Sequence, residues 1–75
     1  MLTIEATAQP GQDIESAARD AVELATRTGC LVDMRFNEIL CVAFPLGDPR
    51  QLVKEFHEAL ASKRQHKMAF AREPS

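Results

Sequence analysis

The stretch CLVDMRFNEILCVAF, residues 30–44, predicts a β-hairpin and decides the fold of this 75-residue chain. Two segments rich in Val, Leu, Ile, Phe and Met, at 30–36 and 39–44, flank the pair Asn37-Glu38. Asparagine tolerates the left-handed backbone of a tight turn, so we predict a two-residue hairpin loop. Glutamate is a poorer second loop residue than glycine, and a longer loop would shift the register by one residue.

The two-residue loop gives the hairpin one wholly apolar face, because side chains alternate between the two faces of a strand. The cross-strand pairs on that face are Phe36 with Ile39, Met34 with Cys41, and Val32 with Ala43. The opposite face carries the residues that we predict to contact another protein: Leu31, Asp33, Arg35, Leu40, Val42 and Phe44. A register shifted by one residue would exchange the two faces.

The second strand of the hairpin is apolar on both faces, and two interpretations fit this pattern. Residues 39–44 are either a central strand covered by neighbouring side chains and chain ends, or a contact surface for another chain. A domain of 75 residues has only a small core, which favours an oligomer. Homodimerisation and binding of a different protein both stay open, because they would use the same residues.

The rest of the chain predicts one further strand and two helices. Residues 2–7 alternate between apolar and polar side chains, which is the period of a half-buried strand. From Asp13 onward apolar residues recur at three- and four-residue steps up to Gly29, which predicts a helix between an N-cap and a closing glycine. The sequence Asp48-Pro49-Arg50-Gln51 is typical of the start of a second helix.

The element order β-α-β-β-α predicts an α+β fold, a two-layer sandwich with a three-stranded mixed sheet and two helices on one face. A right-handed crossover makes strand 2–7 parallel to strand 30–36, and strand 2–7 lies beside either that strand or strand 39–44. We expect a single domain over residues 1–67. Residues 68–75 are expected to form a C-terminal tail, either a helix extension or disordered.

The chemistry-bearing residues match no catalytic or metal-binding pattern. Cys30, Cys41, His57 and His66 lack the spacing of a compact zinc site, and no histidine lies near either cysteine in sequence. The two cysteines are expected about 13 Å apart on neighbouring strands, too far for a disulfide. The three glycines are isolated, so no phosphate-binding loop is predicted. We therefore predict a protein that is not an enzyme and uses no cofactor or metal.

The formal net charge is −2, but basic residues gather near the C-terminus. The alternative function is nucleic-acid binding, in which the candidate phosphate contacts are Lys63, Arg64, Lys67 and Arg72. Against it, the sequence has no Tyr or Trp for base stacking, and a basic helix end also complements the helix dipole. The sequence shows no signal peptide and no membrane-spanning run, so we expect a cytoplasmic protein that does not bind membranes.

The pattern resembles a group of small phage and prophage proteins without an assigned activity. Over residues 2–60 it combines a short strand, a Pro-Gly break, an alanine-rich helix ending in Gly-Cys, a V-x-M-x-F-N hairpin and a D-P-x-Q-L-V helix. The residues that carry the resemblance are Ile14, Glu15, Ala18, Ala21, Leu24, Val32, Phe36, Asn37, Asp48, Leu52 and Val53. One departure is Glu38, where glycine is expected. The resemblance implies an accessory protein of the host-cell cytoplasm that binds a host or phage protein, itself as a homodimer, or both.

Overall fold

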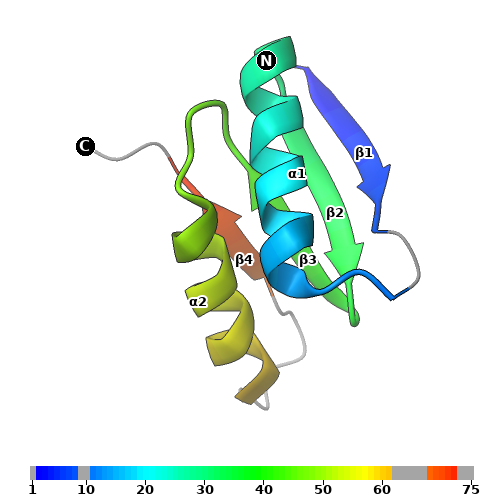
Figure 1. The fold of residues 1–75 in the computed structure, drawn as a ribbon, viewed down its shortest axis with the longest axis vertical. Helices are drawn as coiled ribbons and strands as arrows, with labels where there is room; N and C mark the ends of the chain where they lie inside the picture. Colours follow the sequence, from blue (N-terminus) through cyan, green and yellow to red (C-terminus); the bar gives the residue numbers. More distant parts are fainter. Residues whose placement is uncertain (1, 9–10, 62–67, 73–75) are drawn as a thin grey trace.

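The structure, a computed structural model, describes residues 2–8, 11–61 and 68–72. The elements are β1 (Thr3–Thr7), α1 (Ile14–Thr28), β2 (Leu31–Phe36), β3 (Ile39–Ala43), α2 (Pro49–Ala61) and β4 (Met68–Ala71). The four strands form one mixed sheet in the order β1-β2-β3-β4, and both helices cover the same face of it (Figure 1). The predicted α+β class and the placement of both helices on one face are confirmed.

Strands β2 and β3 form the predicted hairpin in the predicted register. Phe36 pairs with Ile39 at the end of the hairpin that carries the loop. Asn37 and Glu38 both have left-handed backbones, with φ angles of 50° and 66°, as a two-residue loop of this type requires. The left-handed backbone costs a non-glycine residue about 1–2 kcal/mol. The burial of the apolar hairpin face in this register offsets that cost at Glu38.

Strand β1 lies beside β2 and runs parallel to it, which decides between the two positions that the sequence leaves open. Helix α1 makes the crossover between them. The Asp13 carboxylate accepts a hydrogen bond from the backbone N–H of Ser16 at 2.7 Å, so Asp13 is the N-cap. Gly29 closes the helix with a φ of 70°, and its N–H donates to the carbonyl of Ala25 at 2.8 Å. Both predicted helix ends are confirmed.

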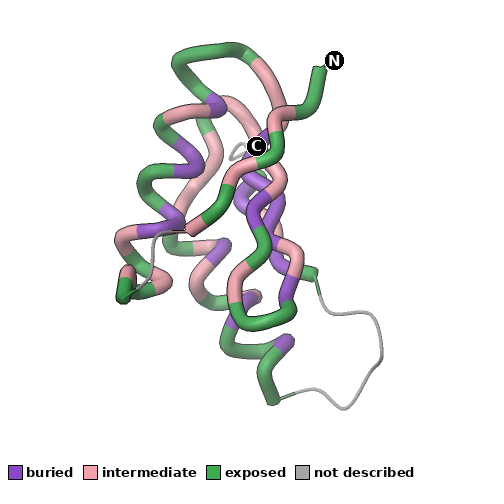
Figure 2. The backbone as a smooth tube through the Cα atoms, turned by 90° about the vertical axis from the view of Figure 1, so that its right-hand side faces the viewer, coloured by how far each residue is buried: buried purple, intermediate pink, exposed green. Residues whose placement is uncertain are grey.

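The core lies between the helices and the sheet, and the buried residues of α1 follow the side of that helix that faces the strands (Figure 2). Alanines predominate on that side of α1, which lets the helix backbone approach the sheet closely. Helix α2 contributes larger groups, and the Phe56 ring meets the Phe36 ring edge to face at a centroid distance of 5.4 Å. The fully buried sheet residues of this core are Val32, Ile39, Cys41, Ala43, Ala69 and Ala71.

The sheet has a fourth strand, so the prediction of three strands is wrong. Residues 68–71, expected in a C-terminal tail, pair in parallel with β3. Ala69 and Ala71 point into the core and are fully buried. A strand of four residues has little local signal of its own, and β4 forms because β3 supplies hydrogen bonds on one side and α2 packs over it.

Side chains of α2 cover the outer edge of β4. The Glu55 carboxylate accepts a hydrogen bond from the backbone N–H of Phe70 at 3.1 Å, and Gln51 Oε1 accepts one from the N–H of Arg72 at 3.0 Å. Gln51 Nε2 in turn donates to Glu55 Oε2 at 2.9 Å. With these donors occupied, the edge is protected against pairing with a further strand. Edge strand β1 has no such cover from the described residues.

The loop between β3 and α2 packs against the end of β4. The backbone N–H of Phe44 donates to the carbonyl of Ala71 at 2.9 Å. The N–H of Gly47 donates to the carbonyl of Phe44 at 3.0 Å. Together these two hydrogen bonds hold the loop beside β4. On the helical side, Thr26 Oγ1 of α1 accepts a hydrogen bond from the N–H of Leu46 at 2.9 Å. The loop therefore joins the helical layer to the sheet.

Candidate protein-contact site on the open sheet face

The sheet face opposite the helices, which we call the open face, carries the candidate site. Its residues follow from side-chain alternation and the strand register. They are Thr3, Glu5 and Thr7 of β1, Leu31, Asp33 and Arg35 of β2, Leu40 and Val42 of β3, and Met68 and Phe70 of β4. Five of the six predicted contact residues thus share one face. The sixth, Phe44, follows the end of β3 and lies in the loop.

The apolar part of the open face lies over β3 and β4. Val42 is only 7% exposed, yet it is not part of the core beneath the helices. Its direct cross-strand neighbours are Asp33 and Phe70. Leu40 is half-buried and its neighbour Met68 is 44% exposed. Val42 lies on an inner strand and has little surface left, whereas Leu40, Met68 and Phe70 keep part of their surface exposed.

Met68 and Phe70 are site residues that the sequence reasoning misses. The available signal is the alternation of large and small residues in the segment MAFA, residues 68–71. This signal covers only four residues. It also follows a basic segment that is typical of the end of a helix.

The charged part of the open face lies over β1 and β2. Asp33 is half-buried and Arg35 is exposed. In the register of β1 and β2, Glu5 is directly beside Asp33 and Thr7 is directly beside Arg35. Within the described residues, the Glu5, Asp33 and Arg35 side chains form no ion pair or hydrogen bond. Two neighbouring carboxylates directly across a strand pair destabilise a sheet unless a cation compensates them.

The basic cluster proposed for nucleic-acid contact is described at one residue only. Lys63, Arg64 and Lys67 lie outside the described residues. The Arg72 guanidinium stacks over the Phe70 ring, with its carbon 4.4 Å from the ring centroid. Its Nη1 atom lies 4.0 Å from Glu55 Oε2. Arg72 is thus engaged with the edge of the sheet.

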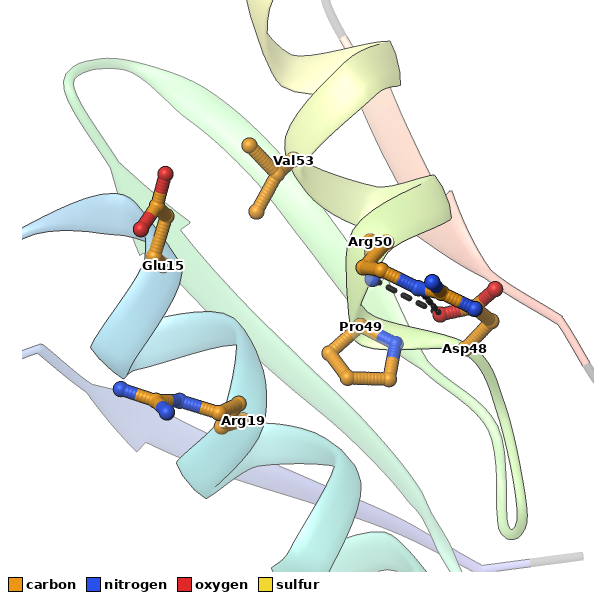
Figure 3. A pocket seen from close by; sticks show the side chains of 6 residues that line it. All are labelled: Glu15, Arg19, Asp48, Pro49, Arg50 and Val53. Atoms are coloured by element: carbon orange, nitrogen blue, oxygen red, sulfur yellow. Dashed lines mark hydrogen bonds and ion pairs between the residues drawn. The ribbon is translucent and has the colours of Figure 1, made fainter.

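A groove on the helical side separates the start of α1 from the start of α2 (Figure 3). It has a volume of about 570 Å³ and is lined by Glu15, Arg19, Asp48, Pro49, Arg50 and Val53. Within it, Asp48 Oδ1 accepts hydrogen bonds from the backbone N–H of Arg50 at 2.9 Å and from its side-chain Nε at 3.4 Å. These lining residues supply two carboxylates and two guanidiniums, but none of them is a Ser, Thr, Cys or His.

Both cysteines are free thiols. Cys30 is half-buried, whereas Cys41 is fully buried in the core. Among the described residues, no three His, Cys, Asp or Glu side chains come close enough to hold a metal ion. His66 lies outside that part of the chain.

The buried thiol predicts a stability change at alkaline pH. Burial raises the pKa of the Cys41 thiol from 9.0 to about 11. The unfolded chain therefore releases this proton at a lower pH than the folded chain, so the free energy of unfolding is intact below pH 9 and falls between pH 9 and 11. The expected loss is about 2–3 kcal/mol. Urea unfolding across this pH range measures it. Cys41→Ala should remove this contribution, and an unchanged pH dependence in that variant would contradict the assignment.

No helix in the described ranges is long and apolar enough to cross a membrane. Comparisons of the chain with protein-family models, curated proteins and solved structures find no match.

Proposed function

We propose that this chain is a non-enzymatic protein-binding module that uses its open face to occupy a surface on another protein. The observation that supports the proposal is the contiguous apolar patch of Leu40, Val42, Met68 and Phe70 on the sheet face opposite α1 and α2. The resemblance to phage and prophage accessory proteins stays a prediction beside it.

The composition of the patch fits a protein contact. An interface combines an apolar, desolvated centre with a polar rim. Phe70 and Met68 supply an aromatic ring and a flexible thioether, two groups enriched in such centres. Asp33 and Arg35 lie beside the apolar residues in the register of β2 and β3, where charges can orient a partner.

Two exposed leucines outside the patch, Leu46 and Leu60, provide a control for mutations within it. Leu40→Asp combined with Met68→Lys changes the open face without placing a charge at Val42, which is only 7% exposed. The control Leu46→Asp combined with Leu60→Lys introduces the same two charged residues elsewhere, at leucines that are 61% and 45% exposed.

Affinity capture from nuclease-treated lysate of the source cells, with quantitative mass spectrometry, compares these variants with the wild type. We expect a stoichiometric protein partner that the wild type and the control retain and the open-face variant loses by at least about tenfold. Equal retention by all three proteins would contradict the open face as the contact. Recovery that depends on nucleic acid would instead support the alternative function.

A further inference from the structure

The charges of the open face are arranged in two rows that cross the sheet. The first row contains Glu5, Asp33, Val42 and Phe70, and the second contains Thr7, Arg35, Leu40 and Met68. Each row begins with polar residues over β1 and β2 and ends with apolar residues over β3 and β4. The acidic row and the basic row are adjacent, about 7 Å apart along the strands.

We propose that the occupant of the open face is a second copy of this chain, packed face to face about a two-fold axis that runs across the strands between the two rows. The proposal rests on the proposed function, because the dimer uses the same face as the contact with another protein, so the face is free for that protein only when the dimer dissociates. This axis lays each row over the other row of the partner. Asp33 then faces the partner's Arg35, and Arg35 faces the partner's Asp33.

The apolar residues complement each other in the same arrangement. Val42 faces the partner's Leu40, and Phe70 faces the partner's Met68. The cation that Glu5 and Asp33 lack within the described chain is then supplied by the partner's Arg35. An interface of this isologous kind makes every contact twice. Two sheets packed with their strands nearly aligned and about 10 Å apart have the required geometry.

The charge pattern selects this axis over the other two-fold axis in the plane of the face. An axis parallel to the strands would lay β2 over the partner's β3. Asp33 and Arg35 would then be desolvated against apolar side chains without an opposite charge, which is strongly unfavourable. Of these two axes, the axis across the strands is the one that sets Asp33 against Arg35 and the apolar residues of β3 and β4 against each other.

The area of the face predicts a weak dimer. Four strands of about five residues present a face of roughly 15 × 17 Å. This is smaller than the contact of a stable complex, so we expect a dissociation constant on the order of 100 µM. Because two of the contacts are ion pairs near the surface, the dimer should weaken further as the salt concentration rises.

Charge exchange tests the arrangement. Asp33→Arg and Arg35→Asp should each weaken the homodimer by at least about tenfold, because like charges then face each other. Two results are specific to the proposed axis. The double exchange Asp33→Arg with Arg35→Asp should restore the homodimer, and an equal mixture of the two single variants should form a heterodimer.

Sedimentation equilibrium at several protein and salt concentrations measures these associations. Matched controls are Glu58→Arg and Arg19→Asp, which make the same charge changes on exposed positions of the helices and should leave the dissociation constant within about threefold. Asp33→Asn and Arg35→Gln remove one charge of each ion pair without placing like charges opposite each other, so each should weaken the dimer by less than the charge exchange at the same position. Circular dichroism establishes that each variant is folded.

A wild-type protein that stays monomeric at about 1 mM, tenfold above the expected dissociation constant, would overturn the proposal. A double exchange that fails to restore the dimer, or single variants that do not pair in the mixture, would overturn it as well. Neither result decides the proposed function, which the capture comparison of the open-face variant with its control tests separately. Failure of that capture with a dimer in solution would leave self-association as the use of the face.

Discussion

Replacing Phe56 with alanine is expected to lower the free energy of unfolding by about 3–5 kcal/mol. Phe56 is only 2% exposed, and its ring packs edge to face against Phe36 across the two layers. A domain of 75 residues has a total free energy of unfolding of about 4–11 kcal/mol, so this one change removes much of it. Urea unfolding followed by far-UV circular dichroism measures the loss.

Two further variants of α2 separate loss of packing from a general effect of mutation. Phe56→Leu retains most of the apolar volume and should cost about 1–1.5 kcal/mol. Glu58→Ala changes an exposed position and should stay within about 0.5 kcal/mol of the wild type. Equal unfolding midpoints for all three variants would show that α2 does not dock on the sheet through Phe56.

Replacing Gly47 with alanine is expected to cost about 3 kcal/mol, for a reason that involves another part of the chain. A Cβ atom at position 47 would lie 2.3 Å from the carbonyl oxygen of Ala71 and 2.8 Å from its carbonyl carbon. These are backbone atoms, and the same oxygen accepts the hydrogen bond from Phe44. The loop and β4 cannot separate without breaking that bond. Thermal and urea unfolding both report the change.

Gly11→Ala is the matched control for this prediction. Gly11 has a φ of 81°, and an added Cβ there would meet no atom of the described residues within 4 Å. Its cost should be limited to the strain of a left-handed alanine, about 1–2 kcal/mol. A Gly47→Ala protein as stable as the wild type would contradict the close approach of the loop to the Ala71 carbonyl group.

The hairpin could be predicted from the sequence because its signals are local and agree with one another. Residues 31–36 alternate between the two faces, and the observed register sets their apolar positions opposite Ile39, Cys41 and Ala43, so that one face of the hairpin is wholly apolar. That register forces Glu38 into a left-handed backbone, so the burial of the strands overrides the preference of the loop residue. The helix ends were predictable for the same reason, since Asp13 and Gly29 act within one turn of their own helix.

The fourth strand could not be predicted because its stability comes from distant residues. Met68–Ala71 has four residues, and its neighbours in the sheet and the helical layer come from β3 and α2. Its outer edge is covered by hydrogen bonds to side chains of α2. Gln51 accepts from Arg72, 21 residues later in the chain, and Glu55 accepts from Phe70, 15 residues later. Gly47 is recognisable in the sequence as a turn residue, but its close approach to Ala71 depends on β4 being present.

Those residues of the candidate site that belong to the hairpin could be predicted from the sequence. Leu31, Asp33, Arg35, Leu40 and Val42 share the open face because alternation and register place them there. Met68 and Phe70 were missed together with β4. Phe44 was placed by extending the alternation one residue beyond the strand, where the chain has already entered its turn toward Gly47.

The unequal edges of the sheet limit how large a strand-to-strand assembly can become. The backbone donors of Phe70 on β4 and of Arg72 directly after it are occupied by Glu55 and Gln51, while β1 lacks such cover among the described residues. Copies joined at their β1 edges would form a pair whose two outer edges are both closed. Growth into a fibre needs a free edge on each side of every copy, so addition through the sheet ends after two chains.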